Sequence, residues 1–197
     1  AGLRLSDVPP AAVRLLKLCV LDHFGCAIGA LDTEVGRAVL RAARMNTGGP
    51  CTVIGAGPPA SPESAALANG TLAHTLIFDD LHRQAKLHPG VAVIPAALAT
   101  AELARADGGA FLTGIAAGYE AAARTGIAIG MSAHRSQGWR ATGTCGSFGA
   151  AAADERAGVG RKVAQFGLAF VGDGLADAIG EHAALDLGIV DQRQRLP

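Results

Sequence analysis

Apolar residues recur every three or four positions through most of the first 130 residues, which is the spacing of an amphipathic helix. A first helix begins at Pro9 and Pro10, because proline suits a first helical turn, and its apolar stripe continues to about Leu31. A second helix is expected from about Thr33 to Met45. Three more helices are expected over residues 61–77, 91–106 and 110–130. The pattern therefore predicts an all-α fold, organised as a helical bundle.

Glycine, proline and hydroxyl residues interrupt this helical pattern at three places. Residues 48–50 read Gly-Gly-Pro and end the second helix. The β-like run at 51–54 that follows predicts at most a short β-hairpin near residue 52. Loops are expected at 79–90 and at 134–149, the second being rich in glycine and hydroxyl side chains.

The character of the chain changes after Asp154, where glycine and arginine break the amphipathic run. A weak helical pattern returns at 163–179, and residues 191–197 are typical of a solvated tail. We therefore predict a helical domain over 1–153 and a divergent segment over 154–197 that contains no recognised domain.

The composition is that of a globular chain at the hydrophobic end of the usual range: of its 197 residues, 50% are hydrophobic, and the mean hydropathy is +0.30. Only 4% of the residues are aromatic, so the core must consist of Ala, Leu, Val and Ile, whose small side chains favour close helix packing. The 17 basic and 17 acidic residues balance without a basic block, which argues against nucleic acid or an anionic membrane as partner. No membrane-spanning run and no signal-peptide pattern is found. Cys19 and Cys26 lie seven positions apart on one face of a predicted helix, where two buried small residues are favoured over a zinc site. The four scattered cysteines are expected to be free thiols, which are typical of a reducing cytoplasm.

The densest group of chemically active residues lies between positions 69 and 90, where three histidines and two adjacent carboxylates fall within one stretch. Asp79 and Asp80, close to His82, supply acceptors and a group that titrates near neutrality, as acid/base catalysis needs. His88 stands just before a helix, so its ring and the first helical amides could hold a substrate carboxylate. The alternative, a solvated loop followed by an ordinary helix entry, stays open on composition alone.

A second candidate site lies at 142–149, where small residues leave backbone amides accessible for an anion. The segment lacks the GK[ST] of a P-loop, so it does not predict nucleotide binding, and a close-packed glycine turn is the alternative. A metal site built from His74, His82, His88 and the two aspartates is not favoured, because the 8- and 6-residue gaps match no standard ligand spacing. We therefore predict neither a metal nor a cofactor.

Six segments in order resemble the MmgE/PrpD family, which includes 2-methylcitrate dehydratase, cis-aconitate decarboxylase and iminodisuccinate epimerase. They read TVIG at 52–55, ALANGTLAHTLIFDD at 66–80, HPG at 88–90, PAALATAE at 95–102, GYEAAAR at 118–124 and TGTCGSFGAAAA at 142–153. The resemblance covers about residues 1–153. It implies an N-terminal helical domain followed by an α/β lid, usually in a homodimer, with the site between the domains. The implied chemistry is cofactor-free elimination, decarboxylation or epimerisation of small di- and tricarboxylic acids.

The resemblance also assigns the site residues. It implies His88, Asp79 and Asp80 as catalytic residues, and we expect His82, Arg140, Thr142, Gly143 and Thr144 to bind the substrate. Three positions depart from the family: Ile77 replaces the first acid of D-[FY]-D-D, Leu81 replaces a hydroxyl, and Arg140 replaces a histidine. An arginine stays protonated near neutral pH, so it can bind a carboxylate but cannot serve as a base.

The resemblance to the family ends abruptly at Asp154, and the later K-x-L-H-x-G segment, which supplies a lysine to the site in the family, is not found. We interpret this as a truncation caused by a frameshift or a misjoined reading frame, which translation of the downstream DNA in three frames would test. The expected function is accordingly that of a lyase or isomerase, impaired or inactive in this chain. The alternative is a non-catalytic helical remnant that binds a small acid or a partner subunit through exposed apolar surface.

Overall fold

The computed structural model describes residues 3–45, 47–55 and 58–157 and shows a helical protein, which confirms the predicted all-α class. A 3₁₀ turn at Leu5–Asp7 precedes the first helix. The α-helices are α1 (Pro10–Gly29), α2 (Glu34–Arg44), α3 (Pro62–Thr75), α4 (Gly90–Ala104), α5 (Gly108–Ile129), α6 (Met131–Ser136) and α7 (Ala141–Ala157). One short strand, β1 (Thr47–Cys51), joins α2 to α3.

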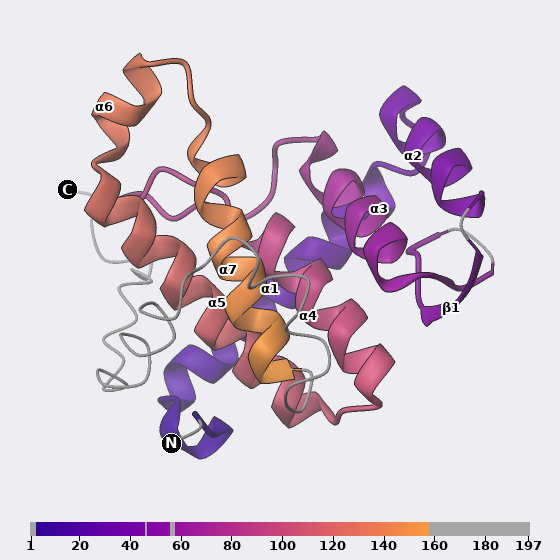
Figure 1. Cartoon of the computed structure of the whole chain (residues 1–197), viewed down its shortest axis with the longest axis horizontal. Helices are drawn as coiled ribbons and strands as arrows, with labels where there is room; N and C mark the ends of the chain where they lie inside the picture. Colours follow the sequence, from indigo (N-terminus) through magenta and orange to yellow (C-terminus); the bar gives the residue numbers. More distant parts are fainter. Residues whose placement is uncertain (1–2, 46, 56–57, 158–197) are drawn as a thin grey trace.

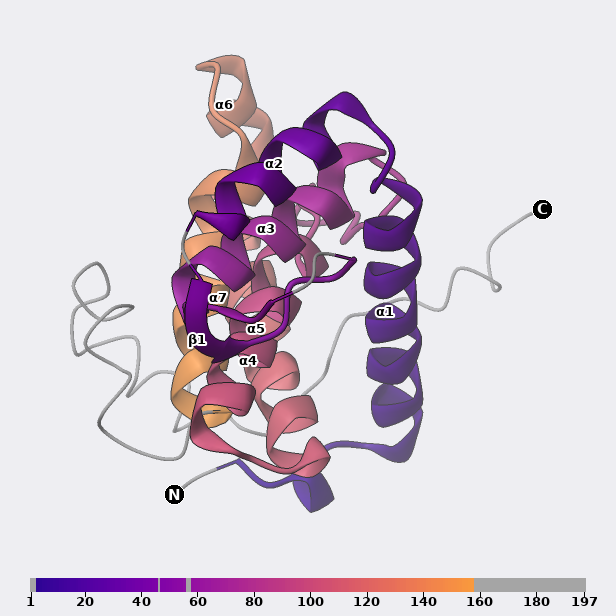
Figure 2. The ribbon, with the colours of Figure 1, turned by 90° about the vertical axis from the view of Figure 1, so that its right-hand side faces the viewer.

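The helices pack as a stack in which α4 is central. Helix α4 contacts α3 on one side and both α5 and α7 on the other, while α1 and α2 pack against α3. Figure 1 shows α7 lying along α5 and α4, and Figure 2 shows α1 standing along one side of the stack. The buried side chains are mostly Ala, Leu, Val and Ile, as the low aromatic content predicted.

Helix α7 approaches α5 more closely than ordinary side chains would allow. A Cβ atom on Gly118 of α5 would lie 2.7 Å from the carbonyl oxygen of Gly149 in α7, and a Cβ on Gly149 would lie 2.8 Å from the carbonyl oxygen of Gly118. A Cβ on Gly114 would meet the Cβ of Ala157 at 2.8 Å. The interface is therefore built from small residues, whose role is to let the two backbones meet.

Two sequence-based expectations are wrong in detail. The segment 134–149 is not one loop, because α6 covers its start and α7 begins at Ala141. Two of its glycines serve helix packing: a Cβ on Gly146 would lie 2.8 Å from the Cβ of Ala92, and a Cβ on Gly149 would lie 2.8 Å from the carbonyl oxygen of Gly118. The β-like run at 51–54 is displaced too, since the strand is Thr47–Cys51 and pairs with Ala60.

Other predictions are confirmed where the structure describes the chain. The helix expected from residue 61 begins there, because the Ser61 side chain accepts a hydrogen bond from the Ser64 amide at 3.3 Å and caps α3. All four cysteines are buried free thiols. The searched part of the chain holds no helix with the length and apolar character that crossing a bilayer demands. Helix α7 continues to Ala157, and the weak helical pattern at 163–179 lies outside the described residues.

Candidate functional site

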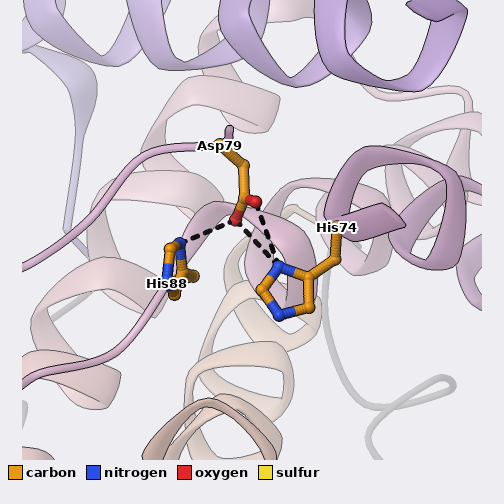
Figure 3. Close-up of side chains that lie close together, drawn as sticks. All are labelled: His74, Asp79 and His88. Carbon is orange, nitrogen blue, oxygen red and sulfur yellow. Dashed lines mark hydrogen bonds and ion pairs between the residues drawn. The ribbon is translucent and has the colours of Figure 1, made fainter. Parts of the chain in front are cut away.

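Three side chains from the predicted polar stretch meet at one point (Figure 3). His74 lies in the last turn of α3, Asp79 in the loop that follows, and His88 two residues before α4. The Nδ1 atom of His74 lies 3.0 and 3.1 Å from the two carboxylate oxygens of Asp79. The Nδ1 atom of His88 lies 3.0 Å from Oδ2 of the same carboxylate. One carboxylate therefore serves two imidazoles, whose ring centroids are 5.0 Å apart.

The three groups differ sharply in their exposure to solvent. The side chain of Asp79 is 2% exposed, whereas that of His74 is 38% exposed and that of His88 is 21% exposed. The His88 Nδ1 atom is itself buried, and its approach to Oδ2 is short without having the angle of a hydrogen bond. The carboxylate is thus a buried anchor, and the two rings connect it to the surface.

A tight turn after α3 brings Asp79 back over His74. Ile77 adopts φ of +50°, a left-handed conformation that is rare for a β-branched residue, and its amide donates to the His74 carbonyl at 3.1 Å. Strain of this kind persists only where the surroundings impose it, and it is frequent at functional sites. The position where the family carries an acid therefore holds a strained isoleucine, 69% exposed.

Asp80, predicted as catalytic, is placed beneath this turn and bonded to three helices. Its Oδ2 accepts from the Tyr119 hydroxyl at 2.7 Å, its Oδ1 accepts from the Gly90 amide at 3.0 Å, and its own amide donates to Asp22 at 3.1 Å. Burial raises the pKa of Asp80 to about 6, although the hydrogen bonds from Tyr119 and Gly90 oppose the rise. Asp80 therefore ties the loop to α1, α4 and α5, and a direct catalytic role for it stays a prediction.

The same geometry bears on the anion site expected at the start of α4. The Gly90 amide, the first of that helix, is already occupied by the Asp80 carboxylate. This part of the helix N-terminus thus binds an anion that belongs to the chain itself.

The predicted substrate-binding residues are only partly brought to the cluster. Thr142 reaches the cluster, because its hydroxyl oxygen accepts a hydrogen bond from the His88 amide at 3.1 Å and so links α7 to the site. The Thr144 hydroxyl instead contacts His134 Nε2 at 3.0 Å, and Gly143 is exposed on α7 with open space around its α-carbon. Arg140 is exposed at the residue before α7.

His82 closes the turn that leads back to His88. Its Nδ1 accepts from the Ala85 amide at 3.1 Å, and its own amide donates to the Leu87 carbonyl at 2.9 Å. Ala85 and Leu87 are fully buried against α5 and α7, which anchors the turn. A role for His82 in binding substrate stays a prediction.

Sequence reasoning gave His74 no role except in the unfavoured metal alternative, yet it is the partner best aligned with Asp79. The five-residue spacing from His74 to Asp79 fits no regular period, because the two are joined by a turn that reverses the chain. His74 also lines a cavity of about 550 Å³ between α2, α3, α4 and α7. Most of the cavity's other lining residues are apolar, among them Val35, Leu67, Val91 and Pro95.

Comparison with known proteins finds one family and several related sequences. The MmgE/PrpD N-terminal domain matches residues 1–157. A cis-aconitate decarboxylase-like protein of Aspergillus oryzae is 30% identical over 162 residues, which cover 78% of this chain and 34% of that protein. The cis-aconitate decarboxylase of Aspergillus terreus is 31% identical over 160 residues, covering 77% of this chain and 32% of that protein.

The chain thus spans about a third of the length of these relatives. The matched domain includes the whole His74–Asp79–His88 cluster and the start of α7 that supports it. On the extent of this match, the chain belongs to the MmgE/PrpD family.

Proposed function

We propose that the cluster is part of the active site of a cofactor-independent lyase or isomerase that acts on small di- or tricarboxylic acids. The observation that carries this proposal is the buried Asp79 carboxylate facing the Nδ1 atoms of two partly exposed imidazoles. Such an arrangement turns the Nε2 atom of each ring away from the carboxylate, where it can meet a substrate. Family membership and the names of the relatives support the same class of chemistry.

In the proposed dehydration, of the kind a 2-methylcitrate dehydratase performs, His88 Nε2 takes the proton from the carbon α to a carboxylate. The electrons of that C–H bond form the C=C bond, and the C–O bond on the neighbouring carbon breaks. The leaving hydroxide takes a proton from His74 and departs as water, so protons and charge balance. Asp79 stabilises the cation that forms on His88. Decarboxylation would need only the acid of this pair: the C–C bond to the departing carboxylate breaks, carbon dioxide leaves, and the electron pair of that bond takes a proton from His74.

Three side chains limit this chemistry in the present chain. Ile77 and Leu81 are exposed and apolar, so neither can accept a proton or bond a substrate hydroxyl. Arg140 can hold a substrate carboxylate but cannot relay a proton. Loss of single hydrogen-bonding groups in active sites lowers rates by factors of about 10² to 10³. We therefore propose little or no turnover by this chain.

The site is expected to bind a small polycarboxylate even where turnover is low. Titration of the purified chain with cis-aconitate and with citrate should shift the imidazole NMR signals of His74 and His88. Asp79→Asn should weaken this binding about tenfold, because the rings lose the anion that orients them. Product formation, assayed in parallel, should stay at or near background.

The matched control is Asp32→Asn, which removes an exposed carboxylate on the segment between α1 and α2. It should bind like the unmodified chain. Unmoved His74 and His88 signals at millimolar acid, or equal weakening by both variants, would contradict the proposed site. Brisk dehydration or decarboxylation would instead contradict the impairment.

A second candidate function, a subunit-interaction module, is favoured by exposed apolar side chains on the turn beside the site. Leu76, Ile77, Phe78 and Leu81 are all exposed there, and Phe78 is 82% exposed. Neighbouring apolar groups of this kind mark interaction surfaces. The proposed partner is a second copy of the chain, as in the homodimers of the family, and the proposed compartment is the cytoplasm.

Phe78→Ser is expected to raise the dissociation constant of that homodimer about tenfold, because a buried aromatic anchor is lost. Sedimentation or light scattering over a range of protein concentrations measures the effect. Leu103→Ser, at the other end of α4, is the control and should leave the assembly unchanged. A chain that is monomeric at high concentration would rule out this surface as a dimer interface.

A further inference from the structure

The His74–Asp79–His88 cluster has the composition of a metal site as well as that of an acid/base site. One potential ligand atom from each residue lies within 4.8 Å of the other two. Two imidazole nitrogens and a carboxylate oxygen are the donors found in catalytic zinc sites, which leave a fourth position open. We infer that His74, Asp79 and His88 form a binding site for a divalent transition-metal ion, with Zn²⁺ fitting this donor set best.

The distances between the donor atoms suit such an ion. Zn²⁺ binds histidine nitrogen and carboxylate oxygen at about 2.0–2.2 Å, which places tetrahedral ligand pairs about 3.3 Å apart. Both imidazole Nδ1 atoms lie 3.0 Å from a carboxylate oxygen of Asp79. All three donor atoms lie within 4.8 Å of one another, so side-chain rotations that bring them closer together would let one ion contact all three. Mg²⁺ and Ca²⁺ prefer sites made of oxygen ligands alone, which argues against either ion at a site with two imidazole nitrogens.

The His88 Nδ1 atom adds a second observation. It is buried and lies 3.0 Å from Asp79 Oδ2, but it makes no hydrogen bond among the residues that the structure describes. A bound ion would satisfy the hydrogen-bonding capacity that this contact leaves unused. His74 lines the 550 Å³ cavity and is 38% exposed, which provides the route by which an ion could enter.

The linear spacing of these residues concealed the site. In the sequence, His82 lies between the other two histidines, so the 8- and 6-residue gaps suggest it as the middle ligand. In the folded chain, His82 instead accepts from the Ala85 amide, and Asp79 lies between His74 and His88. Metal and base chemistry also exclude each other at His88. An ion on Nδ1 leaves the proton on Nε2, so the ring can no longer accept a proton from a substrate.

Metal binding is tested on the full chain with Zn²⁺ and Co²⁺ alone, without any carboxylic acid. Calorimetry should show one Zn²⁺ per chain, and Co²⁺ should give visible absorption typical of a four-coordinate site. His74→Ala, Asp79→Asn and His88→Ala should each weaken Zn²⁺ binding about 100-fold. His134→Ala removes a histidine from α6, outside the cluster, and should bind as before.

Circular dichroism of each variant without metal separates loss of a ligand from loss of the fold. His74→Gln provides a milder change should His74→Ala unfold. No Zn²⁺ binding to the folded chain, or equal affinity in the folded cluster variants and His134→Ala, would overturn the inference. The proposed lyase site is judged separately, by binding of cis-aconitate in the presence of a chelator, so either proposal can fail alone.

Discussion

Gly118→Val is expected to lower the free energy of unfolding by about 3 kcal/mol, the upper part of the range for overpacked cores. Gly118 lies in the middle of α5, where its α-carbon faces the backbone of α7. A Cβ there would lie 2.5 Å from Val93 Cγ1 and 2.7 Å from the Gly149 carbonyl oxygen. The side chain of Val93 could rotate, but the carbonyl belongs to a helix, so α5 and α7 must separate. Separation exposes the small buried residues on which this interface depends.

Urea unfolding followed by circular dichroism measures the change. Gly25→Ala is the matched control, because Gly25 is also a mid-helix glycine, but its Cβ would meet nothing within 4 Å. Alanine there should raise stability by about 0.5–1 kcal/mol through its higher helix propensity. An unchanged stability of Gly118→Val would show that α5 and α7 are not in close contact in solution.

Much of the fold could be predicted because its signals are local. The cap of α3 at Ser61 is contained in three or four consecutive residues, and so is the end of α2 before Gly48. The glycines of α7 could not be interpreted in the same way. A glycine favours a turn when considered alone, and only the presence of α5 and α4 on either side explains Gly146 and Gly149 within a helix.

The site shows the same division between local and distant information. The polar stretch containing Asp79 and His88 stands out against an apolar chain, so its position was predictable. The hydrogen bonds that hold this stretch in place were not predictable, because they come from residues far away in the sequence. Tyr119 bonds Asp80 across 39 positions, and Thr142 bonds the His88 amide across 54 positions. No periodicity in the sequence links such pairs, and only the packing of α5 and α7 brings them together.

His23 gives the second large expected effect, in the dependence of stability on pH. It lies in α1, is 2% exposed, and neither ring nitrogen has a hydrogen-bond partner in the described part of the chain. Burial lowers the pKa of His23 from 6.5 to about 4, and the nearby Asp79 charge opposes the shift only in part. The folded chain therefore resists protonation at this ring, whereas the unfolded chain accepts the proton freely.

The direction in which stability changes with pH depends on whether the folded or the unfolded state binds more protons at His23. Between pH 6.5 and about 4 the unfolded state binds the extra proton at His23, so the stability due to this group is present above pH 6.5 and is lost as the pH falls. The His23→Leu variant has no imidazole to protonate, so it cannot lose this stability as the pH falls. Relative to the unmodified chain, the variant should therefore become more stable by about 2.5 kcal/mol when the pH is lowered from 7.5 to 4.5. Urea unfolding of both proteins at the two pH values measures this difference.

Other buried groups act in the opposite direction, which is why the difference between two proteins is the quantity to measure. Burial raises the pKa of Asp154 from 3.8 to about 6, so the folded state binds that proton first and the stability due to Asp154 grows as the pH falls from 6. Asp154→Asn should accordingly lose stability on acidification relative to the unmodified chain, opposite to His23→Leu. Equal pH dependence of the unmodified chain and His23→Leu would mean that His23 finds a partner or solvent.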